Sequence, residues 1–179
     1  MLNRIMGVAM LKAPVYREIA DDQNGTSQAA IIVVVMAVIG GILGAISIVL
    51  ASSFITDSAQ LAQLGSPVGT AIKTIVNAIL GWLIGSWVMA TVAGAFGGKT
   101  NTGEMLRVFG FTQVFQILAV VPCVGTIAAL ALSIVGAIIG IREAAEFDTT
   151  KAVLTGVVGF IVLMIVSTID GLVLAVVGL

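Results

Sequence analysis

The sequence predicts an all-α integral membrane protein of five transmembrane helices, with a cytoplasmic N-terminus and an external C-terminus. Hydrophobic residues make up 59% of its 179 residues and charged residues only 9%, whereas a soluble domain carries about 25% charged residues. A chain so poor in charge cannot cover its surface with groups that water solvates, so lipid is the solvent that fits. The apolar residues are grouped in five long segments, and nearly all basic residues fall between them on one side.

The five segments are long enough, or nearly so, to cross a bilayer core, which takes about 20 apolar residues. Each must be helical, because lipid offers no partner to an unpaired backbone group. The predicted spans are residues 29–53, 72–96, 105–121, 123–141 and 152–177. The third and fourth are shorter and meet at Pro122, which predicts a tight helical hairpin that either spans the membrane or dips in as a re-entrant pair.

The basic residues give the orientation. Seven of the eight lysines and arginines fall on one side of a five-span chain, and only Lys73 falls on the other. By the positive-inside rule, the side with seven faces the cytoplasm. These seven are Arg4, Lys12, Arg17, Lys99, Arg107, Arg142 and Lys151.

The first 28 residues are expected to form a cytoplasmic segment ahead of a membrane domain at 29–177. Residues 1–13 hold an apolar run with Arg4 and Lys12. A cleaved signal peptide is one interpretation, but no small-x-small cleavage site follows. The other interpretation, which we favour, is a short helix on the cytoplasmic membrane surface with its apolar face among the headgroups.

Local signals mark the ends of the spans. Asn101 and Glu104 have capping-box spacing before the third span, and Asp148 or Thr149 can cap the fifth. Residues 57–65 predict a short external helix that ends at a glycine, before Pro67.

Small residues recur four apart in three of the spans and let helix backbones approach closely. We expect them to pack helices within the bundle; the alternative is an interface between subunits. The residues are Gly40 and Gly44, then Gly81, Gly85, Ala90 and Gly94, and then Gly136 and Gly140.

Three polar residues inside the spans are candidates for function. Asp170 is the only acid deep in an apolar run, so it is either a proton or ion site or a wet position near the outer interface, which we favour. Gln113 and Gln116 share a helix face. Hydrogen bonding between helices is expected for them rather than contact with a substrate.

Catalytic and cofactor signatures are absent from the sequence. There is no P-loop, no zinc-protease motif and no cysteine cluster, and the chain has no histidine and one cysteine, Cys123. We therefore expect no enzyme, no cofactor and no metal site. The net charge of −1 provides no field to attract nucleic acid.

Three stretches resemble the bacterial branch of the Yip1 family of small membrane proteins. The first is the juxtamembrane segment Ala-Pro-Val-Tyr-Arg-Glu-Ile-Ala at 13–20. The second, at 97–111, has a Gly-Gly turn followed by Glu104, a Leu-Arg pair and a Gly-aromatic pair. The third consists of two pieces, residues 140–144 and 150–152, on either side of the turn between the fourth and fifth spans. The likeness covers roughly residues 11–177.

The resemblance implies five spans with the orientation that the charges predict. It also implies vesicle-trafficking and small-GTPase roles for eukaryotic members, whose N-terminal regions are long; this chain has about 28 residues before its first span. We expect a non-enzymatic, multi-pass scaffold or interaction protein of the inner (plasma) membrane. It would be a free-standing organiser or an accessory subunit of a larger complex of respiratory or photosynthetic type. Its expected partners are membrane lipids and other membrane protein subunits, and the alternative function is a small-solute or ion transporter or channel.

Overall fold

The computed structural model describes residues 1–177, apart from the side chains of residues 58, 59, 62 and 166–177. In this part of the chain all regular structure is helical. The elements, in order, are α1 (Leu2–Ala9), α2 (Ala13–Asp21), α3 (Gly25–Ser52), α4 (Ser58–Leu64), α5 (Pro67–Ala95), α6 (Thr102–Thr112), the 3₁₀ helix η1 (Gln113–Val120), α7 (Val124–Ala145) and α8 (Thr149–Val177).

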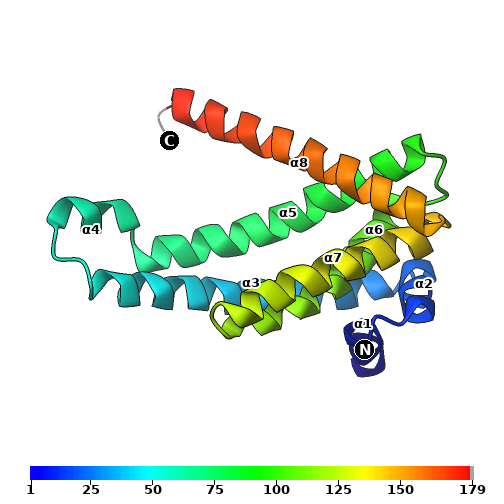
Figure 1. Ribbon diagram of the computed structural model, residues 1–179, viewed down its shortest axis with the longest axis horizontal. Coiled ribbons are helices and arrows are strands. Elements are labelled where there is room, and N and C mark those ends of the chain that lie inside the picture. The colour runs from blue at the N-terminus through cyan, green and yellow to red at the C-terminus, as the bar shows by residue number, and fades with distance from the viewer. Residues whose placement is uncertain (178–179) are drawn as a thin grey trace.

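The long helices α3 and α5 run side by side and are joined by α4 at one end of the molecule (Figure 1). Their backbones approach closely at Gly41, where an added Cβ would lie 3.0 Å from the Ala71 carbonyl oxygen. At the start of α5, the Ser66 hydroxyl accepts a hydrogen bond from the Gly69 N–H, and Pro67 occupies the first turn. N–H groups in the first turn have no partner within the helix, so a proline there, which lacks an N–H, removes no helical hydrogen bond. The short helix predicted at residues 57–65 is confirmed as α4.

The helices α6 and α7 form a hairpin that packs beside α3, and Pro122 lies at its tip. Cys123 has a positive φ of 64°, which completes the tight reversal. The third predicted span is not one continuous α-helix: α6 ends at Thr112, and the next eight residues are 3₁₀. Runs of 3₁₀ helix longer than three or four residues are uncommon, so η1 is a distinct feature of this fold.

The predicted caps are present. Asn101 accepts a hydrogen bond from the Glu104 N–H at 3.0 Å and donates one to the Glu104 carboxylate at 2.7 Å. Asp148 caps α8 by accepting from the Lys151 N–H at 2.9 Å. The starts of α6 and α8 therefore follow from local side-chain chemistry that the sequence shows.

Within the described residues, three helices are long and apolar enough to cross a membrane: α3, α5 and α7. The apolar part of α8 with described side chains, Thr149–Ile165, is shorter. Large apolar side chains on the outer faces of the long helices are exposed, as lipid contact requires. They include Ile42, Leu50, Ile72, Trp87, Ile127 and Phe160. The chain is thus a multi-pass membrane protein.

The core is concentrated at the end of the bundle where α2, α3, α6 and α7 meet. Tyr16, Ile19, Met105, Phe111 and Ile141 are almost completely buried there. Figure 1 shows α1 and α2 lying against this end, near the start of α3. The helix α1 is where the sequence predicts a short one, whereas α2 was not predicted as a helix.

Candidate functional site

A set of polar contacts joins the N-terminal segment to the ends of α6 and α7, and we call it the N-terminal clasp. Its members are Arg4, Tyr16, Arg17, Arg107 and Glu146. They come from α1, α2, α6 and the turn after α7, so the clasp connects parts of the chain that are far apart in sequence.

Arg107 is the centre of the clasp. It is 7% exposed, and its Nε donates to the Ala20 carbonyl oxygen at 3.0 Å while Nη2 donates to the same oxygen. Its Nη1 donates to the Thr26 hydroxyl at 3.3 Å. A guanidinium is expensive to bury without partners. Here it satisfies the carbonyl at the end of α2 and ties that end to the first turn of α3.

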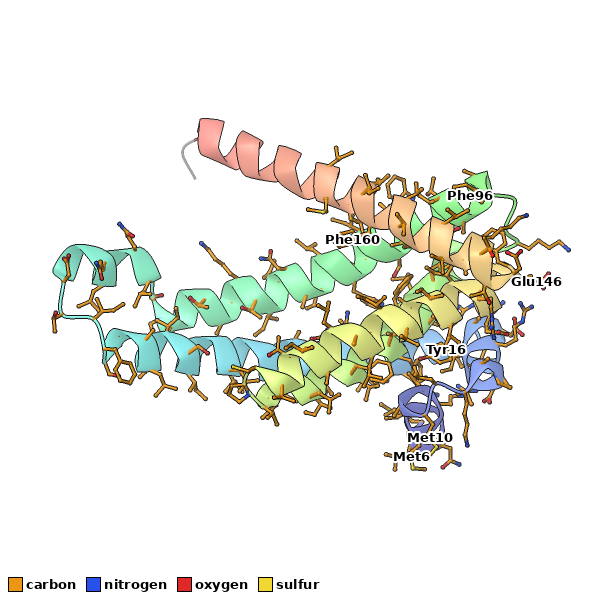
Figure 2. The ribbon with its side chains drawn as sticks, viewed as in Figure 1. Met6, Met10, Tyr16, Phe96, Glu146 and Phe160 are labelled. Atoms are coloured by element: carbon orange, nitrogen blue, oxygen red, sulfur yellow. The ribbon has the colours of Figure 1, made fainter. Side chains whose placement is uncertain are left out.

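Tyr16 fills the space between α2 and α7 and is fully buried (Figure 2). Its hydroxyl donates to the Val8 carbonyl oxygen at 3.4 Å. Burial raises the pKa of the Tyr16 hydroxyl, because the apolar surroundings disfavour the phenolate. Glycine is needed opposite the hydroxyl, because a Cβ at Gly136 would lie 2.9 Å from the Tyr16 hydroxyl oxygen, whereas one at Gly140 would make an ordinary contact with the ring, 3.5 Å from Cδ1.

Arg17 reaches from α2 to the turn between α7 and α8. Its Nη1 donates to the Glu143 carbonyl oxygen at 2.8 Å, and its Nη2 donates to the Glu146 carboxylate at 2.9 Å. Glu146 has a left-handed φ of 56° that ends α7, and it also lies 3.7 Å from the Lys99 ammonium. The acidic loop at 143–148 is therefore neutralised by basic side chains, and no metal-binding group of three or more acids occurs among the described residues.

Arg4 joins α1 to α2. It donates to the Glu18 carboxylate at 2.9 Å and to the Asp22 carboxylate at 2.6 Å. The hydrogen bond from Arg4, followed by one from the Asn24 N–H, holds the pKa of Asp22 below its ordinary value. The two N-terminal helices are thereby held to each other as well as to the bundle.

The small residues predicted for helix packing occupy different surroundings. An added Cβ at Gly40 or Gly44 would meet Thr74 of α5, and one at Gly140 would come within 2.1 Å of the Val108 side chain. Ala90 is buried in the core. By contrast, a Cβ at Gly85 would reach only Leu163, at 3.9 Å, and one at Gly81 or Gly94 would meet nothing within 4 Å.

The intramembrane glutamines lie together on η1, at the edge of two hollows between helices. Gln113 is half-buried and Gln116 is exposed. Neither carboxamide has a hydrogen-bond partner among the described side chains. Asp170, the third intramembrane candidate, lies outside the residues whose side chains the structure describes.

The three stretches that carry the Yip1 likeness meet in the clasp. The segment at 13–20 supplies Tyr16 and Arg17, the stretch at 97–111 supplies Arg107, and the third stretch supplies the Glu143 carbonyl oxygen that accepts from Arg17. This meeting was not predicted from the sequence. A usable signal was present: Tyr16, Ile19 and Ala20 have i, i+3, i+4 spacing after Pro14, which is typical of a helix that buries one face.

Comparison with known proteins agrees with this geometry. A family model described as the Yip1 domain matches residues 8–169 of the chain. No curated protein and no solved structure matches. The match begins at the buried Val8 and contains every residue of the clasp except Arg4. The chain belongs to the Yip1 domain family.

Proposed function

We propose that the protein is a non-enzymatic membrane interaction protein, acting as a scaffold or as an accessory subunit of a larger membrane complex. The observation that supports it most is the N-terminal clasp. Hydrogen bonds from Arg17 and Arg107 fix α2 against the bundle, so a segment of about 24 residues is presented in one conformation outside the spans. A fixed surface lowers the entropy that a partner must overcome on binding.

We place the clasp on the cytoplasmic side of the inner (plasma) membrane, in a chain with five spans. The support is the charge pattern, since seven of eight basic residues belong to this side. Here α6 and η1 together serve as the third span and α8 serves as the fifth. At 1.5 Å per residue the 29 residues of α8 reach about 43 Å, enough to cross a hydrocarbon core of about 30 Å.

We also propose that α1 lies on the cytoplasmic leaflet. Its outer face and its C-cap carry a row of exposed apolar side chains at i, i+4 spacing: Leu2 at 75% and Met6 at 53% exposure in the helix, and Met10 at 64% at the cap. Met6 and Met10 point away from the bundle in Figure 2. A face of this kind favours the headgroup region, where apolar side chains leave water while the polar face stays wet.

The test is isolation in mild detergent followed by mass spectrometry of the chains that co-purify. Arg17→Glu should undock α2, because it places a carboxylate against Glu146 and leaves the Glu143 carbonyl oxygen without its donor. We expect a stoichiometric partner with the native protein and its loss with Arg17→Glu.

The matched control is Lys12→Glu, which makes the same charge change in the same segment at an exposed side chain. It should retain the partner. Equal recovery of the partner with Arg17→Glu would contradict a role for the clasp. Solute flux in proteoliposomes, with no partner recovered, would support the transporter alternative instead.

A further inference from the structure

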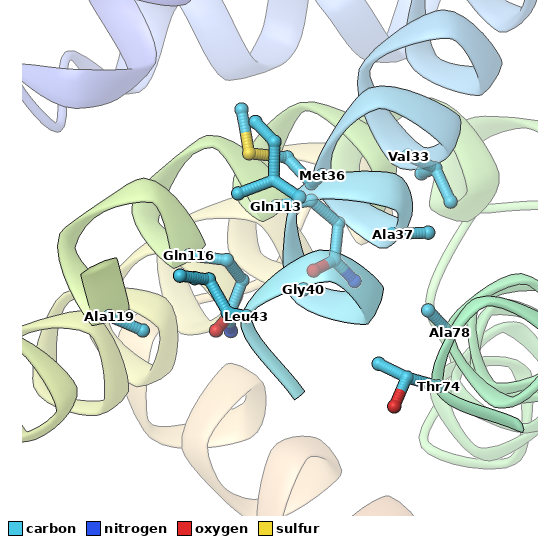
Figure 3. Close-up of a pocket in the computed structure, with 11 residues that line it drawn as sticks. Val33, Met36, Ala37, Gly40, Leu43, Thr74, Ala78, Gln113, Gln116 and Ala119 are labelled. Carbon is cyan, nitrogen blue, oxygen red and sulfur yellow. The ribbon is translucent and has the colours of Figure 1, made fainter. Parts of the chain in front are cut away.

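Two hollows lie on either side of η1 within the membrane-spanning part of the molecule. One, of about 200 Å³, lies between η1, α3 and α5, and its walls include Met36, Gly40 and Ala78. The other, of about 220 Å³, lies between η1, α6 and α7, and its walls include Phe109 and Ser133. Gln113 and Gln116 border both hollows. Figure 3 shows the ends of both glutamines turned toward the α3 segment that carries Gly40 and Leu43.

The threonine hydroxyls that line these hollows are paired with backbone carbonyls of their own helices, whereas the amides and the serine hydroxyl are not. Neither glutamine carboxamide has one among the described side chains, and the buried Ser133 hydroxyl has none either. An unpaired polar group out of water costs on the order of 1–3 kcal/mol. A ligand that offers oxygen atoms to these groups would recover that energy.

The position of the hollows restricts the class of ligand. Gly40 is about 22 Å from the first residue of α3, at 1.5 Å per residue, and so lies close to the middle of this 28-residue helix. A phospholipid headgroup cannot descend to that depth without desolvating its charge. No ionisable residue lines either hollow, so the ligand is an uncharged lipid whose polar group can enter the hydrocarbon core.

The 3₁₀ geometry of η1 restricts the class of ligand further. In a 3₁₀ helix the side chains at i and i+3 are eclipsed, so Gln113 and Gln116 project on the same line, about 6 Å apart along the axis. Two aligned carboxamides suit a flat ring that carries oxygens on opposite edges. A lipid alcohol, with a single hydroxyl, would satisfy only one of them.

We propose that Gln113 and Gln116 form a binding site for the head ring of an isoprenoid quinone. Each carboxamide has both a donor and an acceptor, so the pair can bind the oxidised ring through its carbonyl oxygens and the reduced ring through its hydroxyls. The proposal concerns binding only and involves no electron transfer by the protein. It goes beyond the scaffold function and does not depend on it.

The experiment uses the full-length protein in lipid nanodiscs and decyl-benzoquinone as the probe. Quinones quench tryptophan fluorescence, and Trp82 on α5 is fixed by a hydrogen bond from its Nε1 to the Leu106 carbonyl oxygen of α6. We expect saturable quenching by the native protein and an apparent affinity at least tenfold weaker in Gln113→Leu/Gln116→Leu. The control is Asn77→Leu, which removes an exposed amide of the spans that borders neither hollow and should leave the affinity unchanged.

Two further measurements make the result decisive. Gln113→Asn/Gln116→Asn keeps both amides and shortens each side chain by one methylene group, so it should fold even if the leucine pair does not, and should still weaken binding. An isoprenoid alcohol added as a competitor should not displace decyl-benzoquinone. Unchanged affinity in a folded variant, non-saturable quenching, or equal displacement by the alcohol would each overturn the proposal.

Discussion

Arg107 and Ala20 are 87 residues apart in the chain, yet two guanidinium nitrogens of Arg107 donate to the Ala20 carbonyl oxygen. The carbonyl belongs to the last turn of α2, where helix carbonyls have no partner within their own helix. Arg107 therefore acts as a side-chain cap supplied by a different helix, and it orients α2 on the bundle.

The first prediction concerns that cap. Arg107→Leu should lower the stability of the protein in detergent by roughly 2–4 kcal/mol, because several buried hydrogen bonds to a charged group are lost. Arg107→Lys should recover only part of this, since an ammonium lacks the planar fork that contacts Ala20 and Thr26 together. Thermal unfolding and protease sensitivity of residues 1–24 would measure both effects.

Lys99→Ala is the control for Arg107, because the Lys99 side chain is 83% exposed and its contact with Glu146 is long, at 3.7 Å. Exposed ion pairs contribute at most about 1 kcal/mol. If Arg107→Leu were no more destabilising than Lys99→Ala, the guanidinium would not be what holds α2.

The second prediction compares two glycines that look equivalent in sequence. Gly140→Ala should destabilise the protein, because the new Cβ would lie 2.1 Å from Val108 Cγ1 in a fully buried site and overpacking costs typically 1–3 kcal/mol. Gly94→Ala meets open space and should be neutral or stabilising by up to about 1 kcal/mol, as expected for glycine in a helix. Melting temperatures of the two variants give the comparison.

A loss of stability in Gly94→Ala in the isolated chain would contradict this placement. Loss of a co-purifying protein in Gly94→Leu, with the melting temperature unchanged, would instead indicate that the exposed face of α5 contacts another subunit.

The third prediction concerns pH. The pKa of Asp22 is below its ordinary value of 3.8 because Arg4 donates to it. A carboxylate with a lowered pKa contributes stability above its unfolded pKa and loses that contribution as the pH falls through the folded value. The contact between α1 and α2 should therefore be intact at neutral pH and weaken below about pH 4.

The measurement is amide hydrogen exchange of residues 2–9 in the native protein and in Asp22→Asn, compared at each pH so that intrinsic rates cancel. The variant should exchange faster at pH 6, and the two should converge as the pH falls below the folded pKa of Asp22. A constant ratio across this range would show that Asp22 does not hold α1 through its charge.

The fourth prediction concerns topology. In a Cys123→Ser background, Gln63→Cys in α4 and Lys99→Cys at the α5–α6 turn are both exposed positions. They should be labelled by an impermeant thiol reagent from opposite sides of the membrane, with Lys99→Cys on the cytoplasmic side. Labelling of both from one side would rule out the proposed orientation of α5.

The sequence was sufficient to predict the long apolar helices and two of the caps, because these depend on neighbouring residues, but it did not predict α2. The apolar runs locate α3, α5 and α7, and the Asn101 and Asp148 caps lie where their spacing indicates. The contacts of the clasp could not be predicted from the sequence, because they join residues as distant as Arg17 and Glu146. The change from α6 to η1 was also missed, because no proline or glycine marks residue 113.

The long sequence separation inside the clasp also sets an order of events during synthesis. Arg17 must wait for Glu146, 129 residues later, and a ribosome adding about 5–20 residues per second needs on the order of ten seconds to supply it. Until then α2 leaves the ribosome with its buried face uncovered and its last carbonyls uncapped. The N-terminal segment is thus the first part translated and among the last to be docked, so a chain that stops before α7 displays an exposed Tyr16 that quality-control proteases and chaperones can distinguish from the finished protein.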